Sequence, residues 1–216
     1  MTTGEMLIRG IRDRGGAGAA AWLEEAIPRA RAGLDGLLES YTMASTRLGA
    51  APFEPPSGAE ADAAMAFDRW HLEDAGRLAL LLARLETATD PAAFAEDARA
   101  CYEQGDAREQ ASWLRGVALL PDAGRYLPIV IDACRTNILP VFESVACENP
   151  YPSRHFPERN FNQMVLKALF NNVPLSRIVG LAARANAELA RMAADYAAER
   201  RAAGRSVPAD IGLATG

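Results

Sequence analysis

Hydrophobic side chains recur along most of this chain at steps of three and four residues, which is the spacing of one face of an α-helix. Residues 34–48 follow this spacing with leucine and tyrosine side chains. The strongest stripe in the N-terminal half comprises Phe67, Trp70, His71, Asp74, Leu78, Leu81, Leu82 and Leu85. No stretch alternates convincingly between polar and apolar residues at period two, so the sequence predicts an all-α fold.

Proline and capping residues mark where these helices begin and end. We expect Pro28 to separate two helices, because proline is tolerated only in the first turn of a helix. Three prolines within residues 50–58 predict a loop. Asp90 followed by Pro91 is typical of a helix start, with the aspartate as the N-cap.

The helices expected between residues 90 and 172 are short and joined by tight turns. This arrangement resembles the units of a HEAT-like α-solenoid, although no strict repeat period is present. A longer final helix is expected over residues 186–203 with Asn186 as its cap. The tail after residue 208 has little to bury and should fray. We therefore expect one all-helical domain over residues 1–216, arranged as an irregular helical array.

Composition and charge narrow the class of protein. Half of the 216 residues are apolar and about a quarter are charged, as in an ordinary soluble globular protein. The net charge of −5 argues against a nucleic-acid binder, which needs a basic face to displace counterions from phosphates. The longest apolar run, residues 78–83, is too short for a membrane span, and the first residues lack the apolar segment of a signal peptide. Three cysteines without CxxC spacing indicate free thiols in a reducing compartment, so we expect a cytoplasmic protein.

Familiar catalytic and cofactor motifs find no support in the sequence. Residues 16–21 spell Gly-Ala-Gly-Ala-Ala-Ala, but a dinucleotide-binding loop needs a buried strand before it, and the preceding residues are charged. That segment instead predicts an alanine-rich helix start. No GxSxG motif occurs, and no metal-ligand spacing is recognisable. We therefore expect no cofactor and no metal.

Chemically diverse residues gather in the second half of the chain. The helix expected over residues 159–170 is apolar on most sides, while Asn160, Gln163, Lys167 and Asn171 form one polar line along it. Buried polar groups need partners, so this line should face the polar loop that precedes the helix.

Acids, amides, basic side chains and a thiol of this region are the candidate pocket residues. They are Asp132, Arg135, Asn137, Glu143, Cys147, Glu148, Asn149, His155, Asn160, Gln163 and Lys167. As a site, the acids and His155 would act as acid–base groups or ligands, with Cys134 and Cys147 as soft ligands, and the basic and amide groups would bind an anionic or polyhydroxylated ligand. Cys147 and His155 could form a nucleophile pair, although a neutral buried cysteine is the commoner case. The alternative is architectural: the same amides and acids tie a proline-rich loop to the helix beneath it.

Lys167, the only lysine in the chain, gives the sharpest prediction. Its helix is apolar nearly all round, so the ammonium must reach water, pair with an acid or face a ligand. We predict that Lys167 pairs with Glu148 or Glu143 and that this pair forms the floor of the pocket.

A second candidate site lies in the N-terminal stripe. His71 and Asp74 fall one turn apart on the same face of the expected helix. A carboxylate there could orient the imidazole, as in catalytic and metal sites. The alternative is a partly buried histidine satisfied by a neighbouring acid, which is the commoner arrangement on helices.

Several segments of the C-terminal half carry a resemblance to a known family. They are Asp132-Ala-Cys-Arg-Thr-Asn, Val141-Phe-Glu, Ala146-Cys-Glu-Asn-Pro-Tyr-Pro, His155-Phe-Pro-Glu, Phe161-Asn-Gln-Met-Val-Leu-Lys-Ala-Leu-Phe and Arg205-Ser-Val-Pro-Ala-Asp. With these segments the chain resembles the bacterial EboA family, specifically over the C-terminal half and loosely over the N-terminal half.

The resemblance to the EboA family implies context more than chemistry. The family is encoded in gene clusters of specialised metabolism that are linked to metabolite export and also encode enzymes resembling prenyltransferases, sugar-phosphate cyclases, sugar isomerases and metal-dependent hydrolases. The resemblance implies an accessory or ligand-binding protein, partnered by other proteins of its gene cluster or by a small polar metabolite. The alternative is a small enzyme, a lyase, isomerase or hydrolase that acts on a cyclitol, sugar or prenylated intermediate. The family offers no established catalytic residues to carry over.

Overall fold

The computed structural model describes residues 1–57 and 64–215. The chain is 71% helical, and the β structure of the described residues is confined to an isolated bridge between Pro52 and His71. The predicted all-α fold is therefore confirmed. Within the same residues, no helix has the length and apolar character that a membrane span requires.

The helices group into two compact units, which cover residues 1–121 and 122–216. We call them unit 1 and unit 2 and describe each by itself. The expectation of one all-helical domain over the whole chain stays a prediction, as does that of a HEAT-like solenoid over residues 90–172.

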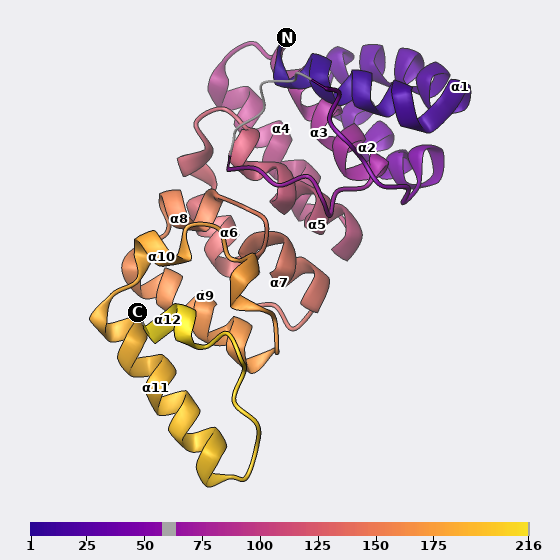
Figure 1. The fold of residues 1–216 in the computed structure, drawn as a ribbon. Helices are drawn as coiled ribbons and strands as arrows, with labels where there is room; N and C mark the ends of the chain where they lie inside the picture. Colours follow the sequence, from indigo (N-terminus) through magenta and orange to yellow (C-terminus); the bar gives the residue numbers. More distant parts are fainter. Residues whose placement is uncertain (58–63, 216) are drawn as a thin grey trace. The chain divides into compact units, whose positions relative to one another are not determined.

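Unit 1 is built around helix α3, which contacts α1, α2, α4 and α5 (Figure 1). In chain order its helices are α1 (Thr3–Ala32), α2 (Leu34–Leu48), α3 (Leu72–Leu85), α4 (Pro91–Glu103), α5 (Ala107–Gly116) and the 3₁₀ helix η1 (Val117–Leu119). Nearly every side chain of α3 is buried, because other helices surround it. Its apolar stripe therefore does not mark a single buried face. The packing is close: a Cβ atom added at Gly76 would lie 2.1 Å from Leu48 Cδ1.

The first helix boundary in unit 1 differs from the sequence expectation. Pro28 lies inside α1 and does not separate two helices, because the boundary falls at Gly33. Helix α1 packs along α3, and we attribute the continuity through the proline to this tertiary packing, which outweighs one lost backbone hydrogen bond. The sequence predicts a helix start in the alanine-rich segment. In the structure, α1 is interrupted at this place by Gly16, whose φ of 69° is not helical.

The start of α3 also lies later than the apolar stripe predicts. Phe67 and Trp70 precede the helix, which begins at Leu72. The Trp70 amide donates to the Phe67 carbonyl at 2.9 Å, and the Phe53 amide donates to the Trp70 carbonyl at 2.8 Å. The three aromatic rings pack against one another, with centroid separations of 5.7 and 5.0 Å. The spacing of these rings therefore reflects packing of a loop, which periodicity alone does not distinguish from a helix face.

In unit 1 the predicted helix start at Asp90 is confirmed, and the predicted proline-rich loop is described in part. The loop predicted over residues 50–58 is free of helix through residue 57, and Gly58 lies outside the described residues. Asp90 caps α4, because its Oδ1 accepts hydrogen bonds from the amides of Ala92 and Ala93, both at 2.8 Å.

Unit 2 is an array of shorter helices around α9, which contacts α7, α11 and η3. In chain order they are η2 (Ala123–Tyr126), α6 (Leu127–Ala133), α7 (Leu139–Ala146), α8 (Tyr151–His155), α9 (Glu158–Phe170), η3 (Leu175–Arg177), α10 (Leu181–Arg184), α11 (Ala187–Ala202) and α12 (Gly212–Thr215). The apolar side of α9 forms the centre of the unit, with Phe161, Val165 and Ala168 fully buried. Figure 1 shows this unit in salmon, orange and yellow.

The C-terminal segment of unit 2 is held by specific contacts. Asn186 caps α11 as predicted, because its Oδ1 accepts a hydrogen bond from the Leu189 amide at 2.9 Å. Further on, Asp210 Oδ2 accepts a hydrogen bond from the Leu175 amide at 2.6 Å, and Ala214 is buried. The tail after residue 208, for which we expected fraying, therefore has contacts that the sequence did not reveal.

Candidate functional site

A cavity of about 140 Å³ lies beside α6 and α9 of unit 2. It is lined by Ile131, Cys134, Arg135, Phe156, Asn160, Gln163, Met164 and Lys167. We call it the α6–α9 pocket. Four of the eleven candidate pocket residues line it: Arg135, Asn160, Gln163 and Lys167. The polar line of α9 thus faces a cavity, while Asn171 beyond it is not among the lining residues.

Lys167 does not pair with Glu148 or Glu143, so that prediction is wrong. Its Nζ donates to the carbonyl oxygens of Cys134 and Thr136, at 2.7 and 2.6 Å. Cys134 is the C-cap of α6, where backbone carbonyls lack partners within the helix and the helix dipole is negative. Both partners of the ammonium are backbone carbonyls at this helix end. No side-chain motif in the sequence marks such carbonyls.

The first acid and base of the candidate set lie at the surface. Asp132 and Arg135 form an ion pair at 3.2 Å, with side chains 78% and 75% exposed. Arg135 lines the α6–α9 pocket, whereas Asp132 is not among its lining residues. Asn137 is exposed and also outside the lining, and the hydroxyl of neighbouring Thr136 accepts a hydrogen bond from the Ile138 amide at 3.1 Å.

Glu143 and Glu148 share a cation that the sequence analysis missed. Arg177 binds Glu148 through two hydrogen bonds, Nε to Oε1 at 2.8 Å and a terminal nitrogen to Oε2 at 2.9 Å, and it lies 3.2 Å from Glu143 Oε1. The hydrogen bond to Glu148 raises the pKa of Arg177 above its ordinary value. The Glu148 amide also donates to the Arg177 carbonyl at 2.9 Å. These contacts tie the loop after α7 to η3, whereas the architectural alternative expected a tie to the helix over residues 159–170.

Asn149 and Cys147 are buried in the same connection. The Asn149 side-chain amide donates to the Ser144 carbonyl, and its oxygen accepts from the Tyr151 amide, both at 2.9 Å. Asn149 therefore joins the end of α7 to the start of α8. The Cys147 side chain is also buried, at 3% exposure.

His155 lies apart from the lining of the α6–α9 pocket. Its ring packs on that of Tyr151, with the centroids 4.5 Å apart, and in the described part of the chain it has no carboxylate partner. Burial, and then the positive charge of Arg154, lower the pKa of His155 below its ordinary value. The neutral imidazole is therefore favoured here.

Arg184 is another residue of this region that the sequence analysis did not single out. Its guanidinium donates to the carbonyls of Ser153 and Phe156, both at 2.7 Å, and lies 4.7 Å from the centre of the Phe161 ring. It thereby fixes the segment before α9 whose Phe156 lines the pocket. Its partners are again backbone carbonyls.

His71 and Asp74, the second candidate pair, belong to a polar network inside unit 1. Asp74 Oδ2 accepts a hydrogen bond from the His71 amide at 2.8 Å and lies 3.5 Å from His71 Nδ1, so it closes the first turn of α3. Its Oδ1 accepts from the Ser112 hydroxyl at 2.6 Å and from Arg115 at 3.1 Å. Asp74 is almost fully buried, while the His71 side chain is 41% exposed.

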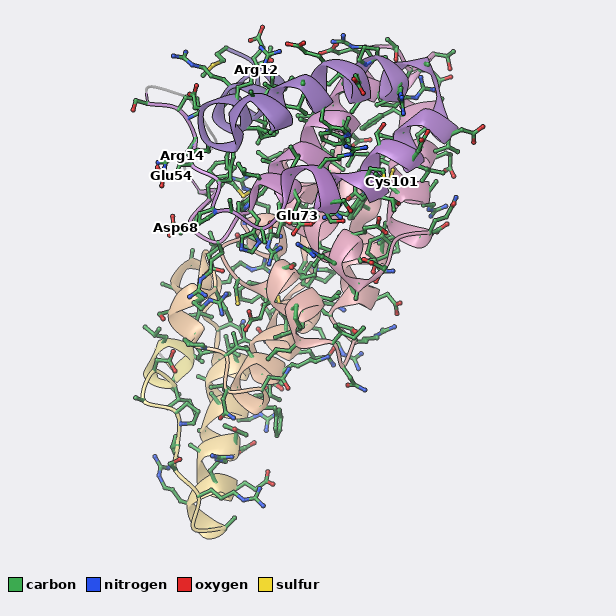
Figure 2. The ribbon with its side chains drawn as sticks, turned by 90° about the vertical axis from the view of Figure 1, so that its right-hand side faces the viewer. Arg12, Arg14, Glu54, Asp68, Glu73 and Cys101 are labelled. Atoms are coloured by element: carbon green, nitrogen blue, oxygen red, sulfur yellow. The ribbon has the colours of Figure 1, made fainter. Side chains whose placement is uncertain are left out.

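The same network contains a buried arginine that the sequence analysis missed. Arg77 is 1% exposed and donates to Glu73 at 3.0 Å, to Ser112 at 2.8 Å and to the Tyr41 carbonyl at 3.1 Å. Glu73, labelled in Figure 2, also accepts a hydrogen bond from Arg108 at 2.7 Å. These charges are mutually satisfied, which is what buried ion pairs require.

A second cavity of unit 2, about 170 Å³, was not predicted. It is lined by Phe170, Tyr196, Glu199, Arg200, Ala203 and Arg205. The Phe170 ring is exposed and packs edge-on against Tyr196, with centroids 4.8 Å apart. The available signal in the sequence was Phe170, an apolar residue at the end of its helix. It was not sufficient, because Tyr196, Glu199 and Arg200 come from a different helix.

The titratable groups that line the α6–α9 pocket are Cys134, Arg135 and Lys167. Burial raises the pKa of the Cys134 thiol to about 12, against a smaller lowering by Lys167, so the thiol is neutral near pH 7. Among residues 1–57 and 64–215, no three histidine, cysteine or acidic side chains gather as a metal ion would require. The pocket therefore presents hydrogen-bond donors and two positive charges beside apolar walls.

A family model described as metabolite traffic protein EboA matches residues 18–215. No curated protein and no solved structure matches the chain. The family match extends over both units and thus also over the N-terminal half, where the sequence resemblance was loose. On this match, the chain belongs to the EboA family.

Proposed function

We propose that this protein is an accessory protein of metabolite traffic that binds a small polar metabolite in the α6–α9 pocket. The observation that carries the proposal is the convergence of Arg135, Asn160, Gln163 and Lys167 on one cavity. Pockets for small molecules combine apolar walls with a few placed polar groups, and Ile131 and Met164 supply part of such a wall here. The description of the family as a metabolite traffic protein fits this role.

The size of the pocket limits what it can hold. A water molecule takes about 30 Å³ of liquid volume, so a cavity of about 140 Å³ holds only a few waters or the equivalent in ligand atoms. The cavity suits a small metabolite or the polar head group of a larger one. A larger ligand would leave its remaining atoms exposed to solvent or to a partner protein.

Binding without catalysis is favoured by the lining of the pocket. A general acid–base reaction needs a carboxylate or histidine within hydrogen-bond reach of the substrate. The candidates of the enzyme alternative lie elsewhere: His155 packs on Tyr151, and Glu148 and Glu143 are held by Arg177. The neutral Cys134 thiol is a poor nucleophile.

The cellular setting forms part of the same proposal. The three cysteines are buried and none of them forms a disulfide, which fits a reducing compartment and supports a cytoplasmic location. Other proteins of the same gene cluster are the proposed partners, since an accessory protein must pass its ligand to another component. The pocket is a surface-accessible place from which such transfer could occur.

Nuclear magnetic resonance with the purified, ¹⁵N-labelled full chain tests this function. Intermediates of the gene cluster are added one at a time, and we expect at least one to shift the amide signals around Cys134 and Lys167. Arg135→Gln should weaken that binding, whereas Arg159→Gln, an exposed arginine of α9 outside the pocket lining, should not. Conversion of an intermediate by the purified protein alone at enzymatic rates would instead favour the enzyme alternative.

A further inference from the structure

The hydrogen-bond donors of the α6–α9 pocket are partly unused. A lysine ammonium has three N–H donors, and the carbonyls of Cys134 and Thr136 occupy two of them. The Nζ atom also lies 5.2 Å from the centre of the Phe142 ring, so the third donor of Lys167 has no hydrogen-bond acceptor among the described residues. The side-chain amides of Asn160 and Gln163 have no hydrogen-bond partner among the described residues, and both line the cavity. The pocket thus offers several donors from one helix.

The charges at this pocket are not balanced. Asp132 offsets Arg135, while Lys167 has no acidic partner among the described residues. The carbonyl end of α6 contributes roughly half a negative charge at most. No aspartate or glutamate is among the described residues that line the cavity. Once Asp132 is counted against Arg135, the net charge of the pocket is positive and no larger than one unit.

The remaining lining is apolar. Ile131, Phe156 and Met164 face the cavity, and the Cys134 thiol beside them is neutral because burial raises its pKa to about 12. A ligand with one negative charge and a short apolar body would satisfy both halves of this surface. A doubly charged phosphate would bring one charge more than the pocket neutralises.

Resting on the function proposed above, we infer that the α6–α9 pocket recognises the carboxylate of a singly charged metabolite. The free N–H of Lys167 and the guanidinium of Arg135 receive the carboxylate oxygens, because an arginine fork matches carboxylate geometry. Asn160 and Gln163 bind the oxygens or a neighbouring hydroxyl. The body of the ligand packs against Phe156 and Met164.

The test uses butanoate as the probe and butanamide as its uncharged analogue of the same shape. The labelled full chain is titrated with each compound and with inorganic phosphate, and amide shifts are recorded. We expect butanoate to shift signals at Cys134, Asn160, Gln163 and Lys167. It should bind at least about tenfold more tightly than butanamide, and more tightly than phosphate.

Two variants assign the charge that is responsible. Lys167→Gln should reduce the preference for butanoate over butanamide to the roughly two- to fivefold that Arg135 alone supplies, and circular dichroism checks that this variant is folded. Arg135→Gln concerns an exposed side chain and serves if Lys167→Gln does not fold; it should weaken butanoate binding roughly two- to fivefold, as expected for one exposed charge contact. The matched control Arg159→Gln should leave binding unchanged.

The outcomes separate this inference from the proposed function. Equal affinities for butanoate and butanamide would overturn the inference of a carboxylate, and tighter binding of phosphate would overturn that of a single charge. If a neutral intermediate of the gene cluster binds in the pocket while butanoate does not, the inference fails and the proposed function stands. If neither the probes nor the intermediates bind there, the proposed function itself fails.

Discussion

At the scale of single residues, arginines and one lysine connect the polar parts of unit 2 in a way that the sequence only half reveals. Arg177 holds the two acids that we had assigned to Lys167. Lys167 instead closes the carbonyl end of α6 and lines the pocket. Arg177 thus forms a structural ion pair, whereas the positive charge of Lys167 has no acidic partner among the described residues.

Replacing Arg177 with methionine tests the structural half of that separation. The change leaves Glu143 and Glu148 without their cation in a partly buried place, so we expect the free energy of unfolding to fall by about 2–4 kcal/mol. Urea unfolding followed by circular dichroism measures the change. Arg191→Met is the control, because Arg191 pairs with acids on an exposed face of α11 and should matter little. Equal stability of the two variants would contradict the role given to Arg177.

At the scale of elements, capping contacts fix where segments stop and what they touch. Asp90 and Asn186 cap α4 and α11 within a few residues of themselves. Asp210 acts over a longer separation, because it accepts a hydrogen bond from the first amide of η3, that of Leu175. This carboxylate ties the tail to η3, beside the contacts that bury Ala214.

Asp210→Ala should release that tail. Loss of the hydrogen bond to the Leu175 amide is expected to speed its hydrogen–deuterium exchange by about tenfold, equivalent to about 1.4 kcal/mol. Exchange measured by nuclear magnetic resonance reports this amide directly. The control is Asp195→Ala, an exposed acid of α11 that pairs with Arg191. Unchanged exchange in Asp210→Ala would contradict this role of Asp210 and would favour the frayed tail expected from the sequence.

The sequence predicted the positions of the helices better than the contacts of their side chains. The period of apolar residues located α2 and α9, because each buries one side against its own unit. It misplaced the start of α3, where Phe67 and Trp70 pack on a loop with helix-like spacing. The polar line of α9 correctly indicated pocket residues, but the partners of Lys167 are backbone carbonyls, which every residue carries and no motif marks.

At the scale of the whole molecule, the buried charge network and the candidate pocket belong to different units. Unit 1 encloses the network of Glu73, Asp74 and Arg77, in which the charges satisfy one another inside the core. Unit 2 holds the α6–α9 pocket, whose donors remain partly open. If the pocket binds a ligand as proposed above, the second unit serves binding, while the network of the first unit serves stability.

This division predicts that residues 122–216 form the pocket without unit 1. All lining residues come from α6, α9 and the segment between them, and the carbonyls that hold Lys167 belong to the same unit. The isolated segment has its own buried core around Phe161 and Val165, so we expect a helical circular dichroism spectrum and cooperative urea unfolding. Its affinity for butanoate should lie within about threefold of that of the full chain, less than 1 kcal/mol. A segment that is folded but has lost this binding would show that the pocket depends on residues 1–121, and an unfolded segment would favour the single domain expected from the sequence.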